Sequence, residues 1–98
     1  MILPVVLRHQ ATEDLLAACD YLEAQRPGLG ARLIGEVRRV LERITTHPEL
    51  HGRVYEDVRR AAVKKFPYSV FYRPTPDRIE VLAVFHDSRD PDGWQGRT

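Results

Sequence analysis

The chain has 98 residues, of which 43% are hydrophobic and 30% are charged, and its formal net charge is +1 at pH 7. This composition is typical of a globular protein and excludes an intrinsically disordered chain, and the length predicts a single domain over 1–98. The longest apolar runs, 2–7 and 81–85, are too short to span a bilayer, and no basic segment precedes an apolar one of signal-peptide length. We therefore expect a cytoplasmic protein.

The first half of the chain predicts one strand and two helices. Residues 2–8 are branched and apolar and carry an early proline, which favours an edge strand. Apolar residues recur at helical spacing over 10–26 and again over 29–44. The segment 26–30 contains proline and two glycines, and Pro48 follows the second pattern, so each helix has a stop. The two helices should form an antiparallel hairpin.

One cysteine and one pair of charged residues in this hairpin lead to more specific expectations. Cys19 is the only cysteine, which excludes an intramolecular disulfide, and its place among apolar residues favours a packing role over a nucleophilic one. Glu36 and Arg39 are three residues apart on the second helix, so they can form an ion pair. We expect that pair on a solvated outer face.

The second half of the chain predicts strands. The segments 58–66, 68–73 and 79–86 are short branched or aromatic runs, and a turn with two prolines separates the last two. The third run is apolar on both faces, which favours a central position with cover on each side. The predicted fold class is α+β: an N-terminal strand, an antiparallel helix hairpin and a three-stranded antiparallel meander, with the helices on one face of the sheet and the other face partly open.

The first of these strands carries an unusual cluster of cations. Arg59, Arg60, Lys64 and Lys65 fall within seven positions that contain no acid. Because side chains alternate along a strand, Arg60 and Lys64 should lie on one face, and Arg59 and Lys65 on the other. Two interpretations stay open. The cations either protect a solvated edge strand against aggregation or bind an anionic partner, which would be an acidic protein or a nucleic acid.

The segment after the last strand is a candidate metal site, because His86 is followed by Asp87, Asp90 and Asp92. A simpler interpretation is that Arg89 pairs with an acid before a proline turn. The sequence has no phosphate-binding glycine loop and no dinucleotide fingerprint. We expect neither a metal nor a cofactor.

Three stretches resemble the RelE/ParE superfamily of bacterial toxins from type II toxin–antitoxin systems. They are "QRPGLGARLIGEVRRVLERITTHPEL", "VRRAAVKKFPYSVFYR" and "IEVLAVFHDSRDPDGW", whose ending is similar to the family pattern H-x-x-R-D-P-x-x-W. The likeness extends over roughly residues 3–95. It implies a small α/β toxin that is held inactive in a hetero-oligomer by a cognate antitoxin, whose disordered segment wraps the helix hairpin and the sheet.

Two activities occur in this superfamily. RelE-like members resemble ribosome-dependent mRNA endonucleases that hold phosphate with Lys and Arg and use a C-terminal Tyr, whereas ParE-like members resemble gyrase inhibitors without a hydrolytic site. This chain has Ser69 where nucleolytic members place an Arg after the first Tyr of the aromatic strand. It has Trp94 in place of the C-terminal Tyr, and an indole does not transfer protons at useful pH. Both differences favour the ParE-like branch.

We therefore expect a growth-inhibiting toxin that acts on DNA gyrase and has no catalytic residues. The residues predicted to contact partners are Arg59, Arg60, Lys64, Lys65, Tyr68, Tyr72, Arg73, Arg89 and Trp94. The first alternative is a RelE-like, metal-independent endonuclease that acts on the ribosome and mRNA. Its catalytic residues would be Lys64, Arg73, His86 and Arg89, with the imidazole as acid or base. The second alternative is an inactive homologue that only binds an antitoxin.

Overall fold

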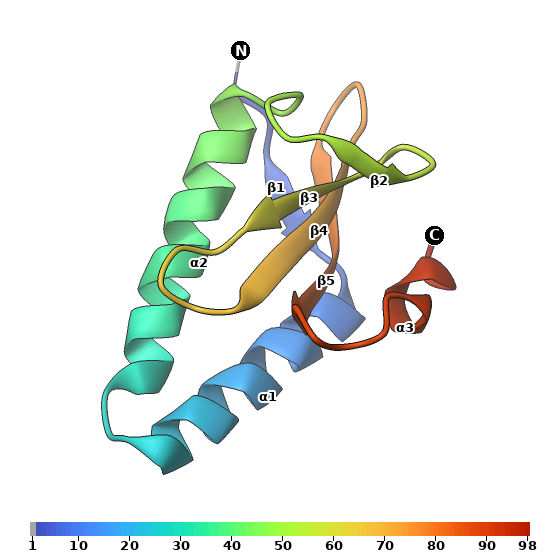
Figure 1. The fold of residues 1–98 in the computed structure, drawn as a ribbon. Coiled ribbons are helices and arrows are strands. Elements are labelled where there is room, and N and C mark those ends of the chain that lie inside the picture. Colours follow the sequence, from blue (N-terminus) through green and yellow to red (C-terminus); the bar gives the residue numbers. More distant parts are fainter. Residues whose placement is uncertain (1) are drawn as a thin grey trace.

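The computed structural model describes residues 2–98, with helices and strands in the order that the sequence predicts. The elements are β1 (Val5–Leu7), α1 (His9–Gln25), α2 (Leu29–Thr46), β2 (Arg53–Tyr55), β3 (Val58–Ala62), β4 (Tyr68–Pro74), β5 (Ile79–His86) and α3 (Asp92–Gln95). Figure 1 shows α1 and α2 as a hairpin beside the sheet, and α3 near the C-terminus.

The described strands form one sheet in the order β1-β5-β4-β3-β2. The strands β2 to β5 make an antiparallel meander, and β1 joins β5 in parallel at the opposite edge. The predicted α+β fold is confirmed, as are the edge position of the first strand and the central position of the last. β5 lies between β1 and β4, and five consecutive residues, 81–85, are buried.

Three features differ from the predicted elements. The strand expected over 58–66 ends at Ala62, because the chain then turns and Lys65 takes a positive φ of 70°. Lys64 therefore lies in the turn and not on the sheet. The strand β2 has three residues and α3 has four, so neither is long enough to show a periodic pattern.

The helix hairpin covers one face of the sheet. Leu33, Val37 and Ile44 of α2 are buried in a cluster with Val70 of β4 and Val81 of β5. Burying apolar side chains of this size contributes about 1.5–3 kcal/mol each to folding. No helix within residues 2–98 has the length and apolar character to cross a membrane.

The turn between α1 and α2 is held by one carboxylate. Glu23 accepts hydrogen bonds from the backbone N–H groups of Gly28 and Gly30, at 2.9 and 3.0 Å. Gly28 has a φ of 94°, which only glycine adopts readily, and a Cβ on Gly30 would lie 3.0 Å from the carbonyl oxygen of Cys19. Burial, together with Asp20, raises the pKa of the Cys19 thiol, which fits a packing role.

The charged side of the helix hairpin is less exposed to solvent than the sequence predicts. The predicted pair is present, with Arg39 3.1 Å from Glu36, but Glu36 is buried and not exposed. Its carboxylate also lies 3.8 Å from the ammonium of Lys65 in the turn between β3 and β4. The acid on α2 thus ties the helix to the sheet.

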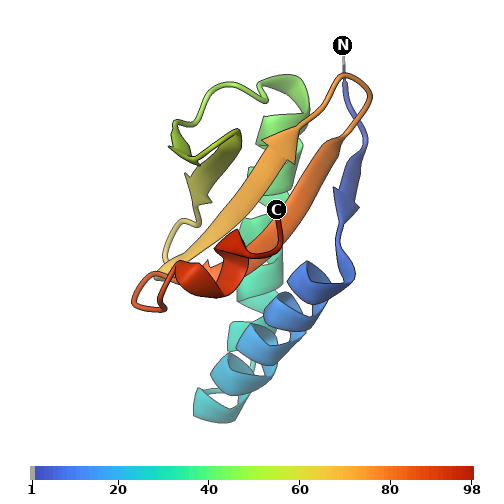
Figure 2. The ribbon, with the colours of Figure 1, turned by 90° about the vertical axis from the view of Figure 1, so that its right-hand side faces the viewer.

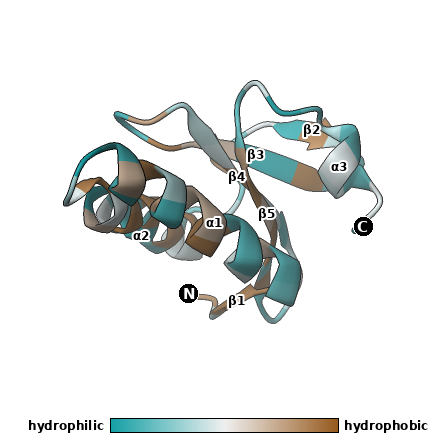
Figure 3. Ribbon diagram, turned by 90° about the horizontal axis from the view of Figure 1, so that it is seen from below, coloured by the Kyte–Doolittle hydropathy of each residue, from teal (hydrophilic) through white to brown (hydrophobic). Residues whose placement is uncertain are grey.

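The other face of the sheet is partly covered by α3. Phe71, Leu82 and Phe85 form a second buried cluster with Trp94, whose side chain is 1% exposed. Phe71 and Trp94 are stacked with ring centroids 4.5 Å apart. Figure 2 shows α3 on the side of the sheet opposite to α1 and α2, and in Figure 3 the brown, hydrophobic ribbon of β5 lies between them. We call this second side, which carries Phe71, Phe85 and Trp94, the outer face.

The C-terminus is tied back to α1 and β5 by ionic contacts. The guanidinium of Arg97 donates to the two carboxylate oxygens of Asp14 at 2.7 and 3.3 Å, and to the carbonyl oxygen of Leu82 at 2.9 Å. The N–H of Val84 donates to the same carboxylate at 3.1 Å, and Arg8 donates to the carbonyl oxygen of Arg97. The long-range contacts of Arg97 with Asp14, Leu82 and Arg8 keep α3 against the outer face.

We expect Trp94→Ala to lower the free energy of unfolding by about 3–5 kcal/mol, because it opens a cavity between α3 and the sheet. Chemical denaturation measures the effect. Tyr21→Ala is the matched control, since that aromatic side chain is 61% exposed and its loss should change stability little. Equal effects of the two variants would show that Trp94 does not hold α3 in place.

Candidate functional site

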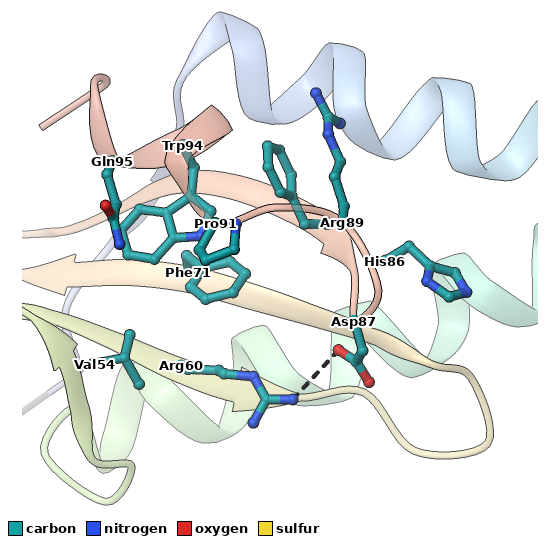
Figure 4. Close-up of a pocket in the computed structure, with 10 residues that line it drawn as sticks. Val54, Arg60, Phe71, His86, Asp87, Arg89, Pro91, Trp94 and Gln95 are labelled. Atoms are coloured by element: carbon teal, nitrogen blue, oxygen red, sulfur yellow. Dashed lines mark hydrogen bonds and ion pairs between the residues drawn. The ribbon is translucent and has the colours of Figure 1, made fainter.

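The outer face carries a pocket of about 280 Å³ beside α3. Figure 4 shows its lining side chains: Val54, Arg60, Phe71, Phe85, His86, Asp87, Arg89, Pro91, Trp94 and Gln95. The aromatic residues form an apolar floor, and charged residues that follow β5 or lie on β3 form the rim. The pocket combines an apolar body with a few polar groups, as binding sites do.

One ion pair dominates the rim. The guanidinium of Arg60 lies 3.3 Å from a carboxylate oxygen of Asp87, and the hydroxyl of Ser69 donates to that same oxygen at 2.7 Å. Ser69 is fully buried and pairs with Phe85 across the sheet. The residue found where nucleolytic relatives place an Arg is thus engaged with an acid.

Arg89 turns away from Arg60. Its guanidinium lies 3.7 Å from the ring centroid of Phe85, a cation–π contact, and 3.9 Å from the carboxylate of Asp14 on α1. Figure 4 shows the side chain directed toward α1, while Arg60 is directed toward Asp87. The two pocket cations therefore do not point at one common position.

The hydrogen bonds of His86 favour one tautomer of its neutral ring. The backbone N–H of Ser88 donates to Nδ1 at 3.0 Å, and the Ser88 hydroxyl lies 2.8 Å from the same nitrogen. An atom that accepts an N–H carries no proton, so the neutral imidazole has its proton on Nε2. The ring is held edge-on to Tyr68, with centroids 5.1 Å apart. The free nitrogen of neutral His86 is a donor and not a base.

Arg59 and Lys65 lie on the helix side of the sheet, Arg59 on β3 and Lys65 in the turn after it. Arg59 donates to the carbonyl oxygen of His51 at 2.7 Å, and the hydroxyl of Tyr72 donates to that of Pro48 at 2.8 Å. Arg59 and Tyr72 thus hold the loop after α2. The ammonium of Lys65 lies 3.8 Å from the carboxylate of Glu36 on α2. Lys64 is exposed, and it has no ion pair among residues 2–98.

The three aromatic residues that the sequence predicts to contact partners are buried in the described structure. Tyr68 is 7% exposed, Tyr72 is 0% and Trp94 is 1%. The indole N–H of Trp94 has no hydrogen-bond partner in the described part of the chain. Tyr68 and Tyr72 belong to the buried cluster on the helix side and Trp94 to the cluster of the outer face, so only a small part of each side chain is available to a partner.

Arg73 belongs to a separate ionic network. Glu80 accepts hydrogen bonds from Arg8 and Arg73 at 3.1 Å each and from Arg78 at 2.8 Å. Arg73 also lies 3.8 Å from Asp57. Hydrogen bonds from Arg78 and Arg73, with that from Arg8, lower the pKa of Glu80 from 4.5 to about 2. The network joins Arg8, the residue between β1 and α1, to β4 and β5.

The four candidate catalytic residues do not come together. Arg73 pairs with Glu80 across the sheet, whereas His86 pairs with Tyr68 five positions away, which corresponds to about 16 Å along the strand. Only His86 and Arg89 line the same pocket, and Lys64 lies in the turn. No group of three His, Cys, Asp or Glu suited to a metal is found in residues 2–98.

The sequence interpretation missed the role of Asp87. It was considered only as a possible metal ligand, whereas it pairs with Arg60, which is 27 positions earlier in the chain. The strand alternation that placed Arg60 on the outer face was a usable signal. The register of β3 against β4 and β5, which brings the two residues together, was not available from one sequence.

Comparison with known proteins identifies the family. Residues 5–91 match the family described as "ParE toxin of type II toxin-antitoxin system, parDE". The chain belongs to the ParE toxin family. This ParE-family chain is 31% identical to Toxin ParE2 of Mycobacterium tuberculosis, strains CDC 1551 / Oshkosh and H37Rv, over 91 residues that cover 88% of the chain and 87% of the relative.

A solved structure shares the fold. It is described as "Chromosomal ParDE TA system from P. aeruginosa" and superposes with a TM-score of 0.75 at 18% identity, covering 87% of this chain and 96% of that one. Together with the family match, the shared fold confirms the resemblance to the RelE/ParE superfamily and the ParE-like branch of it.

The ParE-family chain should show the Nε2–H tautomer at His86 when the imidazole is neutral. Long-range ¹H–¹⁵N NMR spectra of the ring distinguish the two nitrogens, and His47, which is exposed on the helix hairpin, serves as the comparison. A protonated Nδ1 in the neutral ring would contradict the hydrogen bond from Ser88.

Glu80→Gln should lower the free energy of unfolding by about 1–2 kcal/mol at pH 7, allowing for solvent screening. The pKa of Glu80 is lower in the folded state, about 2, than the usual 4.5. Its stabilisation is therefore present above about pH 4.5 and is lost as the pH falls toward 2. Urea denaturation at several pH values measures this, with the exposed Glu42→Gln as control. A pH-independent difference between wild type and Glu80→Gln would contradict it.

Proposed function

We propose that this ParE-family toxin inhibits growth by binding DNA gyrase, and that a cognate antitoxin neutralises it. Family membership supports a toxin of a type II toxin–antitoxin system. The choice of gyrase over RNA rests on one observation, which is that the outer face lacks a converging set of groups for strand cleavage.

Metal-independent RNA cleavage requires a base, an acid and cations around one phosphate. Arg60 is paired with Asp87, and Arg89 points toward α1. The Nε2–H of a neutral His86 ring donates a hydrogen bond but does not accept a proton, and the indole of Trp94 is buried and does not transfer protons. Among residues 2–98, the carboxylate of Asp87 is the basic group that lines this pocket, and it is engaged by Arg60 and Ser69. A protein that acts by holding its target needs no base.

The helix hairpin offers a surface for the antitoxin. Leu16 and Tyr21 of α1 are 55% and 61% exposed, although both are large and apolar. Tyr21 also lines a groove of about 470 Å³ between α1 and the sheet, which is lined on the sheet side by Tyr68 at the start of β4 and by Val84 of β5. Exposed apolar residues next to a groove fit an amphipathic peptide segment, which supports an antitoxin as partner.

One observation favours the RelE-like endonuclease as a second candidate. Arg60, His86 and Arg89 line the same pocket, and a rearrangement of side chains on binding RNA would bring cations toward a phosphate. An inactive homologue that only binds an antitoxin is the remaining reading.

Two assays on the purified chain separate these functions. We expect inhibition of gyrase supercoiling at stoichiometric toxin, with no cleavage of mRNA on translating ribosomes. Ribosome-dependent mRNA cleavage would overturn the proposal in favour of the endonuclease. Inactivity in both assays, with an antitoxin peptide still bound, would leave only the binding module.

A pair of variants tests whether the outer face contacts gyrase. Arg89→Gln should weaken gyrase inhibition by about tenfold, because it removes an exposed pocket cation, a typical loss for one charged contact. Arg38→Gln removes an equal charge from the exposed side of α2 and should change inhibition less than twofold. If both variants weaken inhibition alike, the contact surface is not the outer face.

A further inference from the structure

We propose that Asp87 is a specificity-determining residue: its carboxylate occupies the anion position of Arg60 and keeps nucleic-acid phosphate out of the outer-face pocket. The inference deepens the proposed function and rests on it for its biological meaning. The claim that one carboxylate weakens RNA binding is supported by the contacts within the pocket.

The carboxylate is held in place from two sides. Ser69 is fully buried, and its hydroxyl donates to Asp87 at 2.7 Å. The backbone N–H of Asp87 donates to the carbonyl oxygen of Pro67 at 2.8 Å, which fixes the start of the loop after β5. Asp87 is therefore a preorganised acceptor, although its side chain is 38% exposed.

The guanidinium of Arg60 could bind a phosphate, but its charge is already neutralised by the carboxylate of Asp87. Its guanidinium is 43% exposed, lines the pocket and lies 3.3 Å from Asp87. A guanidinium can bind carboxylate or phosphate through two parallel hydrogen bonds. With Asp87 present, a phosphate that approaches Arg60 meets a fixed negative charge a few ångströms away.

No other cation of the pocket compensates. Arg89 lies over the ring of Phe85 and near Asp14, directed away from Arg60 (Figure 4). The charge of Asp87 thus determines whether an anion that approaches Arg60 is attracted or repelled. Removing that charge alone should expose a cation above an apolar floor, which suits a phosphate next to a base.

The test is the binding of a fluorescent single-stranded RNA oligonucleotide, measured by anisotropy over a range of salt concentrations. Asp87→Asn keeps the oxygen that accepts from Ser69 but removes the charge. We expect it to bind RNA about tenfold more tightly than wild type at low salt. One additional phosphate contact should also steepen the salt dependence by about 0.7 in log–log slope.

Two matched variants separate a local site from net charge. Asp20→Asn makes the same charge change on the exposed side of α1 and should stay within twofold of wild type. The double variant Arg60→Gln/Asp87→Asn restores the wild-type net charge and should lose the gain. Thermal melting confirms that each variant folds, and Asp87→Ser, a second neutral replacement, should reproduce the gain.

Three results would overturn the inference. These are a gain below twofold for both neutral replacements of Asp87, an equal gain for Asp20→Asn, or a gain that survives in the double variant. Gyrase inhibition is measured separately on the same proteins. Failure there with the RNA gain intact would overturn the gyrase proposal alone, whereas gyrase inhibition without the RNA gain would overturn only the role of Asp87.

Discussion

β5 is apolar on both sides, so two layers must cover it, and the rest of the fold follows from that constraint. The hairpin of α1 and α2 covers one side, and Trp94 covers part of the other. Because α3 has only four residues, it cannot hold that position by its own helical stability and depends on the contacts of Arg97 with Asp14 and Leu82. The outer-face pocket exists because this cover is incomplete.

The abundance of arginine has a structural explanation as well as a functional one. Arg59 holds a loop, Arg73 and Arg78 share the carboxylate of Glu80, and Arg97 ties the C-terminus to α1. A cationic stretch in the sequence is therefore a poor measure of the charge that a partner meets. On the described surface, the cations of β3 and its turn are distributed between internal contacts and solvent.

Periodicity was sufficient to predict the two long helices, the strands and the central place of the last strand, because burial of one or both faces leaves a regular pattern. It could not predict the early end of β3, because the turn after this strand places Lys65, and not a glycine, at a positive φ. It could not find Asp87 opposite Arg60 or the burial of Glu36 either. Both depend on contacts between residues far apart in the sequence, which a local pattern does not encode.

The parallel pairing of β1 with β5 also constrains when the protein can fold. Val5 lies opposite Ile79, and the carboxylate of Asp14 finds its guanidinium only at Arg97. Contacts between residues so distant in sequence form slowly and late. During synthesis the N-terminal strand has no partner until β5 has been made. A nascent copy that lacks residues 79–97 therefore has neither a complete sheet nor the contact between Asp14 and Arg97, and so no finished surface with which to act on a target.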